Sequence, residues 1–262
     1  MTTRIQQLFD RRKSENKAVL VAYLTAGDPT PEATPGLVAA LERGGADLIE
    51  LGVPFSDPIA DGPVIQRGSD RALKAGTTVA KVLLMAKNIR ETSQIPLLLF
   101  TYLNPVLRYG LENLARDAKA AGIDGCLLTD VSVEEAGPYV DAMRGAGLDT
   151  VFLAAPTSTP ERLQLVAKYS SGFIYLVSRT GVTGERAELS DALQPLIDAT
   201  RAISKLPVAA GFGISTPEQA GAVAKIADGV VVGSAIVRLI EQSAGEAGLE
   251  KYARSLRAGM DR

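Results

Sequence analysis

The chain has 262 residues, of which 46% are hydrophobic and 22% are charged, which indicates a globular protein with a substantial core. Its formal net charge is −2 and its Lys and Arg residues are scattered, which argues against nucleic acid or an anionic membrane as a partner and favours small molecules or proteins. No apolar run approaches the roughly 20 residues that span a bilayer and no signal peptide is evident, so we expect a cytoplasmic protein.

Short apolar runs alternate with longer Ala-rich stretches, which is typical of parallel strands joined by helices. Before the first strand, Ile5, Leu8 and Phe9 have the spacing of an amphipathic helix that covers the N-terminal end of the sheet. The predicted strands are 18–25, 48–53, 97–101, 125–129, 150–154, 173–177, 208–211 and 229–232. Extra helices are predicted at 64–74 and 79–91, after the second strand, and at 234–242 and 249–258, after the last.

Eight such strands favour a closed (β/α)8 TIM barrel in a single domain of residues 1–262. The strands are nearly continuous apolar runs, such as PLLLF and DGVVVG, as expected when both faces of a sheet are buried. An open doubly wound sheet is the alternative. In that fold the first strand leads into a GxGxxG turn, whereas here it leads into TAGDPTPE.

Two residue counts limit the chemistry. The sequence has no histidine, which excludes a Ser-His triad, an imidazole base and every metal site that contains histidine. Acid and base roles therefore fall to carboxylates, Tyr or Lys. The single cysteine, Cys126, cannot form an intrachain disulfide, and in the apolar run GCLLTD we expect an inert buried thiol.

Glycine-rich segments follow the last three predicted strands. Gly213 lies in GFGIS after the seventh strand, and Gly233 and Ser234 open a helix after the eighth. Singly, each motif is explained by a tight turn or by Ser234 as an ordinary N-cap, but together they match the recurring phosphate site of barrels. The segment SRTGVTG, which contains Gly181 and Gly184, adds backbone donors in a loop able to close over a ligand.

Acidic residues lie in and after the second predicted strand, in ADLIELGVPFSDPIADGP. Glu50 has apolar neighbours in a strand that should be buried, where an unpaired carboxylate is costly. It is either a structural residue paired with backbone or Arg, or a general acid/base with a raised pKa. Asp57 and Asp61 follow in a loop restricted by prolines. An ordinary solvated aspartate is the alternative for each, and spacing alone does not decide between the two. Asp61 is also a candidate N-cap of the next helix.

The segment LIELGVPFSDPIADGP resembles the signature of the tryptophan synthase alpha subunit family. YLTAGDP, TYLNPV, SRTGVTG and AAGFGIS are similar to further parts of that family, in the same order, so that the resemblance covers essentially the whole chain. It implies a lyase of tryptophan biosynthesis that cleaves indole-3-glycerol phosphate to indole and glyceraldehyde 3-phosphate. It also implies that Glu50 is the catalytic acid/base, that Asp61 partners the indole nitrogen, and that Tyr175 lies near Glu50 or the substrate, although Tyr175 could also be a core residue.

The same resemblance implies groups of binding residues. Those for the substrate phosphate are Gly184, Gly213, Gly233 and Ser234. Those for the indole pocket are Tyr23, Phe100, Leu127, Phe212 and Ile214. Thr183 is implied to contact Asp61 when the site closes, and Pro54, Asp57 and Pro58 are implied to face a beta subunit. That partner would carry pyridoxal phosphate in an alpha2beta2 heterotetramer, while this chain is expected to hold neither a cofactor nor a metal.

Three other functions share part of this pattern. A stand-alone indole-3-glycerol phosphate lyase has the same catalytic motifs but needs no partner. A catalytically silent barrel that activates a partner enzyme would not need Glu50 and Asp61. A sugar-phosphate isomerase or epimerase would share the phosphate site but not this pair of acids.

Overall fold

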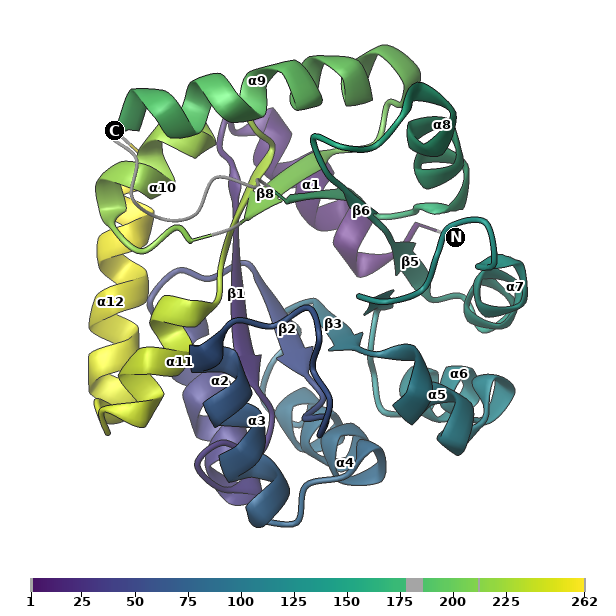
Figure 1. The fold of residues 1–262 in the computed structure, drawn as a ribbon. Coiled ribbons are helices and arrows are strands. Elements are labelled where there is room, and N and C mark those ends of the chain that lie inside the picture. The colour runs from purple at the N-terminus through teal and green to yellow at the C-terminus, as the bar shows by residue number, and fades with distance from the viewer. Residues whose placement is uncertain (1, 178–185, 212, 262) are drawn as a thin grey trace.

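Parallel strands form a barrel, and helices surround it (Figure 1). The computed structural model describes residues 2–177, 186–211 and 213–261. Its strands are β1 (Val19–Thr25), β2 (Leu48–Gly52), β3 (Leu97–Thr101), β4 (Gly125–Leu128), β5 (Asp149–Val151), β6 (Leu153–Ala154), β7 (Ile174–Val177), β8 (Val208–Gly211) and β9 (Gly229–Val232). The predicted bounds are correct for β3, β8 and β9 and differ by one residue at one end for β1, β2, β4 and β7.

The fifth predicted strand is divided into two short strands, β5 and β6. The order of hydrogen-bonded strands is β5-β4-β3-β2-β1-β9-β8-β7-β6, so β5 and β6 are the two ends of the sheet, and only Phe152 separates them in sequence. The prediction of one continuous strand at 150–154 was therefore wrong, because β5 pairs with β4 while β6 pairs with β7. The predicted closure is confirmed by the pairing of β1 with β9, which excludes the open sheet.

Helices follow the strands around the outside of the barrel (Figure 1). They are α1 (Arg4–Ser14), the short 3-10 helix η1 (Pro31–Ala33), α2 (Thr34–Arg43), α3 (Pro63–Lys74), α4 (Val79–Arg90), α5 (Leu103–Tyr109), α6 (Leu111–Ala120), α7 (Gly137–Gly145), α8 (Pro160–Tyr169), α9 (Arg186–Ile203), α10 (Pro217–Ala224), α11 (Ser234–Glu241) and α12 (Gly245–Met260). The predicted extra helices are confirmed as α3, α4, α11 and α12, the last of which begins four residues before the predicted start at 249. In the described ranges, no helix has the length and hydropathy of a membrane-spanning segment.

The N-terminal end of the barrel is closed by α1, as the sequence predicts. Ile5, Leu8 and Phe9 are buried in one cluster with the side chains that fill the barrel interior, among them Phe173. The ring centroids of Phe9 and Phe173 are 5.4 Å apart. A ligand can therefore enter the barrel only from the C-terminal ends of the strands, which is also where barrel enzymes carry their active sites.

The expected burial of Cys126 is confirmed. The residue is 1% exposed on β4, and burial raises the pKa of its thiol to about 12, against a smaller opposing effect of a hydrogen bond with Tyr139. A thiol that stays protonated at neutral pH is a poor nucleophile and a poor metal ligand, so the cysteine is part of the core.

The closing role of α1 gives a prediction for stability. We expect Phe9→Ala to lower the free energy of unfolding by about 3–5 kcal/mol, because it removes a buried ring and leaves a cavity against Phe173. Urea unfolding followed by circular dichroism measures the change. Leu84→Ala on α4, where the side chain is 57% exposed, is the matched control and should cost less than about 1 kcal/mol. Equal losses in the two variants would contradict the role of Phe9.

Candidate active site

Glu50 points into the barrel from β2. The register pairs it with Tyr23 of β1 and Leu98 of β3. Its neighbour two residues earlier, Leu48, belongs to the interior cluster, whereas Ile49 and Leu51 belong to the cluster between strands and helices. Because alternate residues of a strand face the same side, Glu50 shares the inward direction of Leu48 but lies closer to the open end.

The carboxyl group of Glu50 is buried without compensation. The residue is 1% exposed, its Oε1 atom has no hydrogen-bond partner, and no ion pair to it occurs in the part of the chain that the structure describes. Burial raises its pKa from 4.5 to about 8, so the neutral acid predominates at pH 7. A structural glutamate held by Arg or by backbone, the first alternative for this residue, does not match these contacts.

Asp61 lies in the loop between β2 and α3 and is half-buried. Burial raises its pKa to about 6, opposed by a hydrogen bond with the Tyr102 hydroxyl, so it is mainly ionised at pH 7. The interpretation of Asp61 as an N-cap was wrong, because Gly62 occupies that position and α3 has no side-chain cap. The backbone of Asp61 is fixed in place: its N–H donates to the Pro58 carbonyl at 3.1 Å, and its carbonyl accepts from Gln66 Nε2 at 2.8 Å.

Two tyrosines connect the acids. Burial, followed by the charge of Asp61 and, with a smaller effect, that of Glu50, raises the pKa of Tyr23. Burial and the charges of Glu50 and Asp61 also raise the pKa of Tyr175, with Glu50 the stronger of the two acids. Since both carboxyl groups act on the same pair of hydroxyls, Glu50 and Asp61 both lie within electrostatic range of Tyr23 and Tyr175.

Two interior glycines, Gly52 and Gly211, make room for these tyrosines, a role that the sequence indicated for neither. A Cβ atom on Gly52 would lie 2.3 Å from the Tyr23 hydroxyl, and one on Gly211 would lie 2.7 Å from the Tyr175 hydroxyl. Both distances are below contact distance, so any side chain at either glycine would displace a tyrosine beside Glu50. Only tertiary proximity reveals this requirement.

Tyr102 is a further site residue to which sequence reasoning assigned no role, although it lies in the quoted segment TYLNPV. It is 2% exposed, its hydroxyl accepts a hydrogen bond from the Ala60 N–H at 3.1 Å, and it lowers the pKa of Asp61. Its ring lies 5.2 Å from that of Phe55, centroid to centroid. Tyr102 therefore holds the loop that carries Asp61 at two points, and no local pattern could have indicated that.

The predicted phosphate-binding residues lie near the start of α11 and after β8. Gly213 has φ +73°, and Gly233 is the N-cap of α11. Ser234 is the first residue of the helix, so its interpretation as an ordinary N-cap was wrong. The N–H groups of a first helical turn have no partner within the helix, and they attract anions together with the helix dipole. Gly184 lies outside the described residues.

The residues predicted for the indole pocket are only partly brought together. The rings of Tyr23 and Phe100 are 5.2 Å apart and nearly perpendicular, and Leu127 belongs to the interior cluster against which Phe100 packs. Ile214 instead packs in the cluster between the strands and the helices, away from that group. Two other predicted site residues, Phe212 and Thr183, lie outside the described residues, and so does the predicted bond between Thr183 and Asp61.

The segment predicted to face a partner is exposed in part. Asp57 is exposed and Pro58 is half-buried, but Pro54 is buried, because the chain at this point is still leaving the barrel. Next to them, Ile59 is 84% exposed, which is unusual for a large apolar side chain. Leu107 on α5 is 56% exposed.

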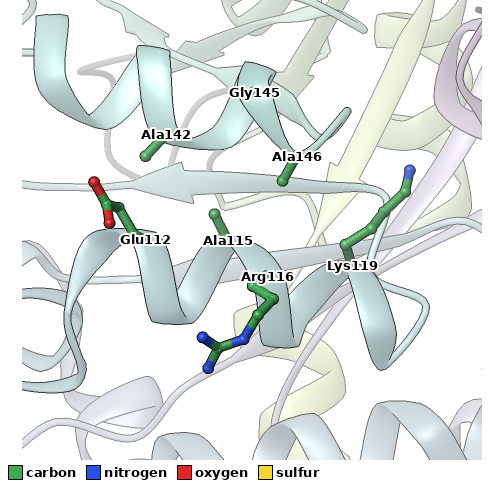
Figure 2. A pocket seen from close by; sticks show the side chains of 7 residues that line it. All are labelled: Glu112, Ala115, Arg116, Lys119, Ala142, Gly145 and Ala146. Atoms are coloured by element: carbon green, nitrogen blue, oxygen red, sulfur yellow. The ribbon is translucent and has the colours of Figure 1, made fainter.

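Two cavities lie away from the acids. One, of about 390 Å³, lies between α6 and α7; Figure 2 shows Ala115 facing Ala142 and Ala146, while Arg116 points away. Its lining is mostly Ala and Gly, and of its charged residues Arg116 pairs with Asp117 and Lys119 donates to the Gly147 carbonyl. Small residues at a helix crossing are enough to explain it.

The other cavity, of about 870 Å³, lies at the closed end of the barrel, and its lining includes Lys13, Arg201 and Lys225. These three residues lie at or next to the C-terminal ends of α1, α9 and α10. Each helix end carries about half a negative charge, so the cations there have a structural explanation.

Comparisons with known proteins agree with one another. The model of the family "Tryptophan synthase alpha chain" matches residues 9–260. The tryptophan synthase alpha chain of Solibacter usitatus is 68% identical over 261 residues, which cover 98% of each chain. The crystal structure of tryptophan synthase subunit alpha from Legionella pneumophila has a TM-score of 0.92 at 37% identity and covers 100% of this chain and 99% of its own. A structure of the tryptophan synthase α2β2 complex from Pyrococcus furiosus has a TM-score of 0.87 at 42% identity, covering 92% and 98%.

The burial of Glu50 predicts a pH dependence of stability. Between pH 4.5 and about 8 the folded protein keeps a proton on Glu50 that the unfolded chain has released, so this residue makes the protein less stable as the pH rises. The full loss, reached above pH 8, is at most about 5 kcal/mol. We expect Glu50→Gln to be more stable than the wild type by a margin that grows from pH 5 to pH 8 and then stays constant.

Denaturant unfolding of both proteins at each pH measures this margin. Asp61 titrates in both proteins, so the difference between them isolates Glu50. A margin that does not change with pH would show that Glu50 ionises normally in the folded state.

Proposed function

The chain belongs to the tryptophan synthase alpha chain family, and we propose that it cleaves indole-3-glycerol phosphate with Glu50 and Asp61 as its two working acids. The observation that carries this assignment is the pair of carboxyl groups with separated pKa values, about 8 for Glu50 and about 6 for Asp61, at the open end of one barrel. At neutral pH the first is an acid and the second an anion. The reaction needs one of each.

Glu50 is suited to the proton transfers. Cleavage of the carbon–carbon bond requires a proton on indole C3, which turns the ring into a leaving group, and loss of a proton from the adjacent hydroxyl of the glycerol chain. Glu50 donates its proton to C3, and the resulting carboxylate accepts the hydroxyl proton as the bond breaks. The hydroxyl becomes the aldehyde of glyceraldehyde 3-phosphate, and the bonding electron pair returns to the ring as indole leaves. A pKa near the working pH favours both transfers.

Asp61 is suited to stabilise the intermediate. Protonation of C3 places positive charge on the indole ring, centred on its nitrogen. A carboxylate beside that N–H interacts more strongly with the cation than with the neutral substrate, and such a difference lowers the barrier. The hydrogen bond with Tyr102 favours the anionic form of Asp61 at rest.

The substrate phosphate is assigned to Gly213, Gly233 and Ser234, with Gly184 from the loop after β7. A Cβ atom on Gly233 would lie 3.3 Å from the Cβ of Tyr23, so the start of α11 is adjacent to the residue that flanks Glu50. Tyr175 beside Glu50 is assigned to orient the carboxyl or the substrate. The indole ring is assigned to Tyr23, Phe100 and Leu127, and the remaining assignments, Phe212 and the closing contact of Thr183, come from the family resemblance.

The partner is the beta subunit of tryptophan synthase, in an α2β2 assembly like that of the Pyrococcus furiosus relative. The exposed side chain of Ile59, two residues after the exposed Asp57, supports this loop as the contact, because a large apolar side chain gains free energy when a partner buries it. Pyridoxal phosphate belongs to the beta subunit in this proposal, and a cytoplasmic location remains our prediction.

Loss of the Glu50 carboxyl should abolish catalysis but not folding. We expect Glu50→Gln to release indole at least about 10²–10⁴ times more slowly than the wild type, because glutamine has no proton to donate. Asp61→Asn should also be slow, since it removes the charge that stabilises the cation. Glu112→Gln, at the lining of the distant cavity between α6 and α7, is the control and should be as active as the wild type. Indole production by Glu50→Gln at the wild-type rate would refute the assignment.

Dependence on the partner separates the alpha subunit from a stand-alone lyase. We expect added beta subunit to raise the rate of indole-3-glycerol phosphate cleavage several-fold or more, because docking against the loop after β2 places the Asp61 side chain against the substrate. The measurement is consumption of the substrate by the isolated chain and by the mixture. Replacing Ile59 by Asp should reduce the stimulation without changing the basal rate. Full activity of the isolated chain would instead favour the stand-alone enzyme.

A further inference from the structure

We propose that Arg71 is a positioning residue that sets the spacing between Asp61 and the phosphate-binding turn at Ser234. It does so by joining α3, which follows Asp61, and α11, which begins at Ser234, to each other and to the loop after β1. This inference rests on the proposed function, because the spacing matters only if one ligand spans both groups.

Four charged side chains form the network that connects these segments. Arg71 makes a bidentate pair with Asp28, with Nε to Oδ1 and Nη2 to Oδ2 both 2.8 Å. Its remaining Nη1 donates to Glu241 Oε1 at 2.9 Å. Arg67 makes a second bidentate pair with Glu241, at 2.7 and 2.9 Å. Of these four side chains, Arg71 is the one that contacts both the loop after β1 and the end of α11.

The pair with Asp28 is not an ordinary surface ion pair. Asp28 is fully buried, with 0% exposed, and both of its carboxylate oxygens accept from Arg71. The planar guanidinium matches a carboxylate in this fork geometry, whereas an ammonium group cannot satisfy both oxygens in the same way. The pair thus fixes the direction of α3 as well as its distance from the loop.

The same three segments meet at Gly68. A Cβ atom on Gly68 would lie 2.9 Å from Val237 Cγ1 of α11, 3.1 Å from Asp28 Oδ2 and 3.1 Å from Thr25 Oγ1 of β1. The absence of a side chain lets α3 pack directly on α11 and on the end of β1. Any rotation of α3 is therefore resisted at Gly68 and at Arg71, one turn apart on the helix.

The geometry carries this restraint to the site. Gly68 contacts Val237, and Arg71 contacts Glu241. Later residues of α3 therefore contact later residues of α11, so the two helices run in the same direction and their N-terminal ends lie on the same side. Figure 1 shows these two helices side by side. Asp61 lies two residues before α3, and Ser234 is the first residue of α11. Locking the helices together sets the distance between the group that binds the indole nitrogen and the group that binds the phosphate.

The consequence is specific to a ligand that spans both groups. A misplacement of about 1 Å can cost about 10²-fold in rate when two ends of a substrate must be held at once. A ligand that touches only one end is indifferent to the spacing. This difference separates positioning from mere support of the fold.

The test compares one spanning ligand with two fragments. Indole-3-propanol phosphate carries both ends, whereas indole and inorganic phosphate carry one each. For Arg71→Lys, which keeps the charge but not the fork, and for Glu241→Gln, which leaves the buried pair intact, we expect the affinity for the spanning ligand to fall about tenfold or more. The affinities for both fragments should stay within about twofold of the wild type, and kcat for cleavage should fall.

Arg43→Lys is the matched control. Arg43 joins α2 to α12 through ion pairs with Glu250 and Glu246 and contacts neither α3 nor α11 through them, so its replacement should change the affinity for neither kind of ligand. The positioning role would be overturned if the affinities for the fragments fell as much as that for the spanning ligand. It would also be overturned if neither variant changed any affinity. A wild-type protein that binds indole-3-propanol phosphate but releases no indole from the substrate would instead overturn the proposed function.

Discussion

An uncompensated carboxyl group inside an apolar barrel is the constraint on which the site depends. Glu50 has no ion pair among the described residues, and burial alone raises its pKa to about 8. That burial requires a barrel filled beneath it and closed by α1, because water entering from the N-terminal end would solvate the carboxylate and return its pKa toward normal. The packing of Phe9 against Phe173 at the closed end of the barrel thus contributes to the raised pKa of Glu50 at the open end.

The residues around Glu50 keep its pKa high. Tyr23 and Tyr175 flank it, and they fit only because Gly52 and Gly211 have no side chain. Neither tyrosine carries charge at neutral pH, so they provide hydroxyl groups without the cation that would lower the pKa of Glu50. An Arg or Lys in either place would stabilise the carboxylate form of Glu50 and lower its pKa.

The sequence predicted features that depend on local pattern. The apolar runs located the strands, the spacing of Ile5, Leu8 and Phe9 located α1, and the isolation of Glu50 among apolar residues indicated a buried acid. It could not predict features set by neighbours in space. The division at Phe152 depends on which strand pairs with each half, and Tyr102, Gly52 and Arg71 matter only through residues distant in sequence. Ile214 was assigned to the pocket from its motif, but the turn at Gly213 directs it to the outer core.

The unequal burial of the two acids also determines how they respond to substrate. An indole ring that displaces water from Asp61 raises its pKa further, so the neutral substrate makes the anion less favourable. The cation formed after C3 protonation acts in the opposite direction and restores the anion. In the proposed mechanism Asp61 therefore binds the ground state weakly and the charged intermediate strongly, which is the difference that accelerates a reaction. Glu50 cannot fill this role, because a group already neutral at rest has no charge to offer. The assignment of acid and anion follows from depth in the barrel.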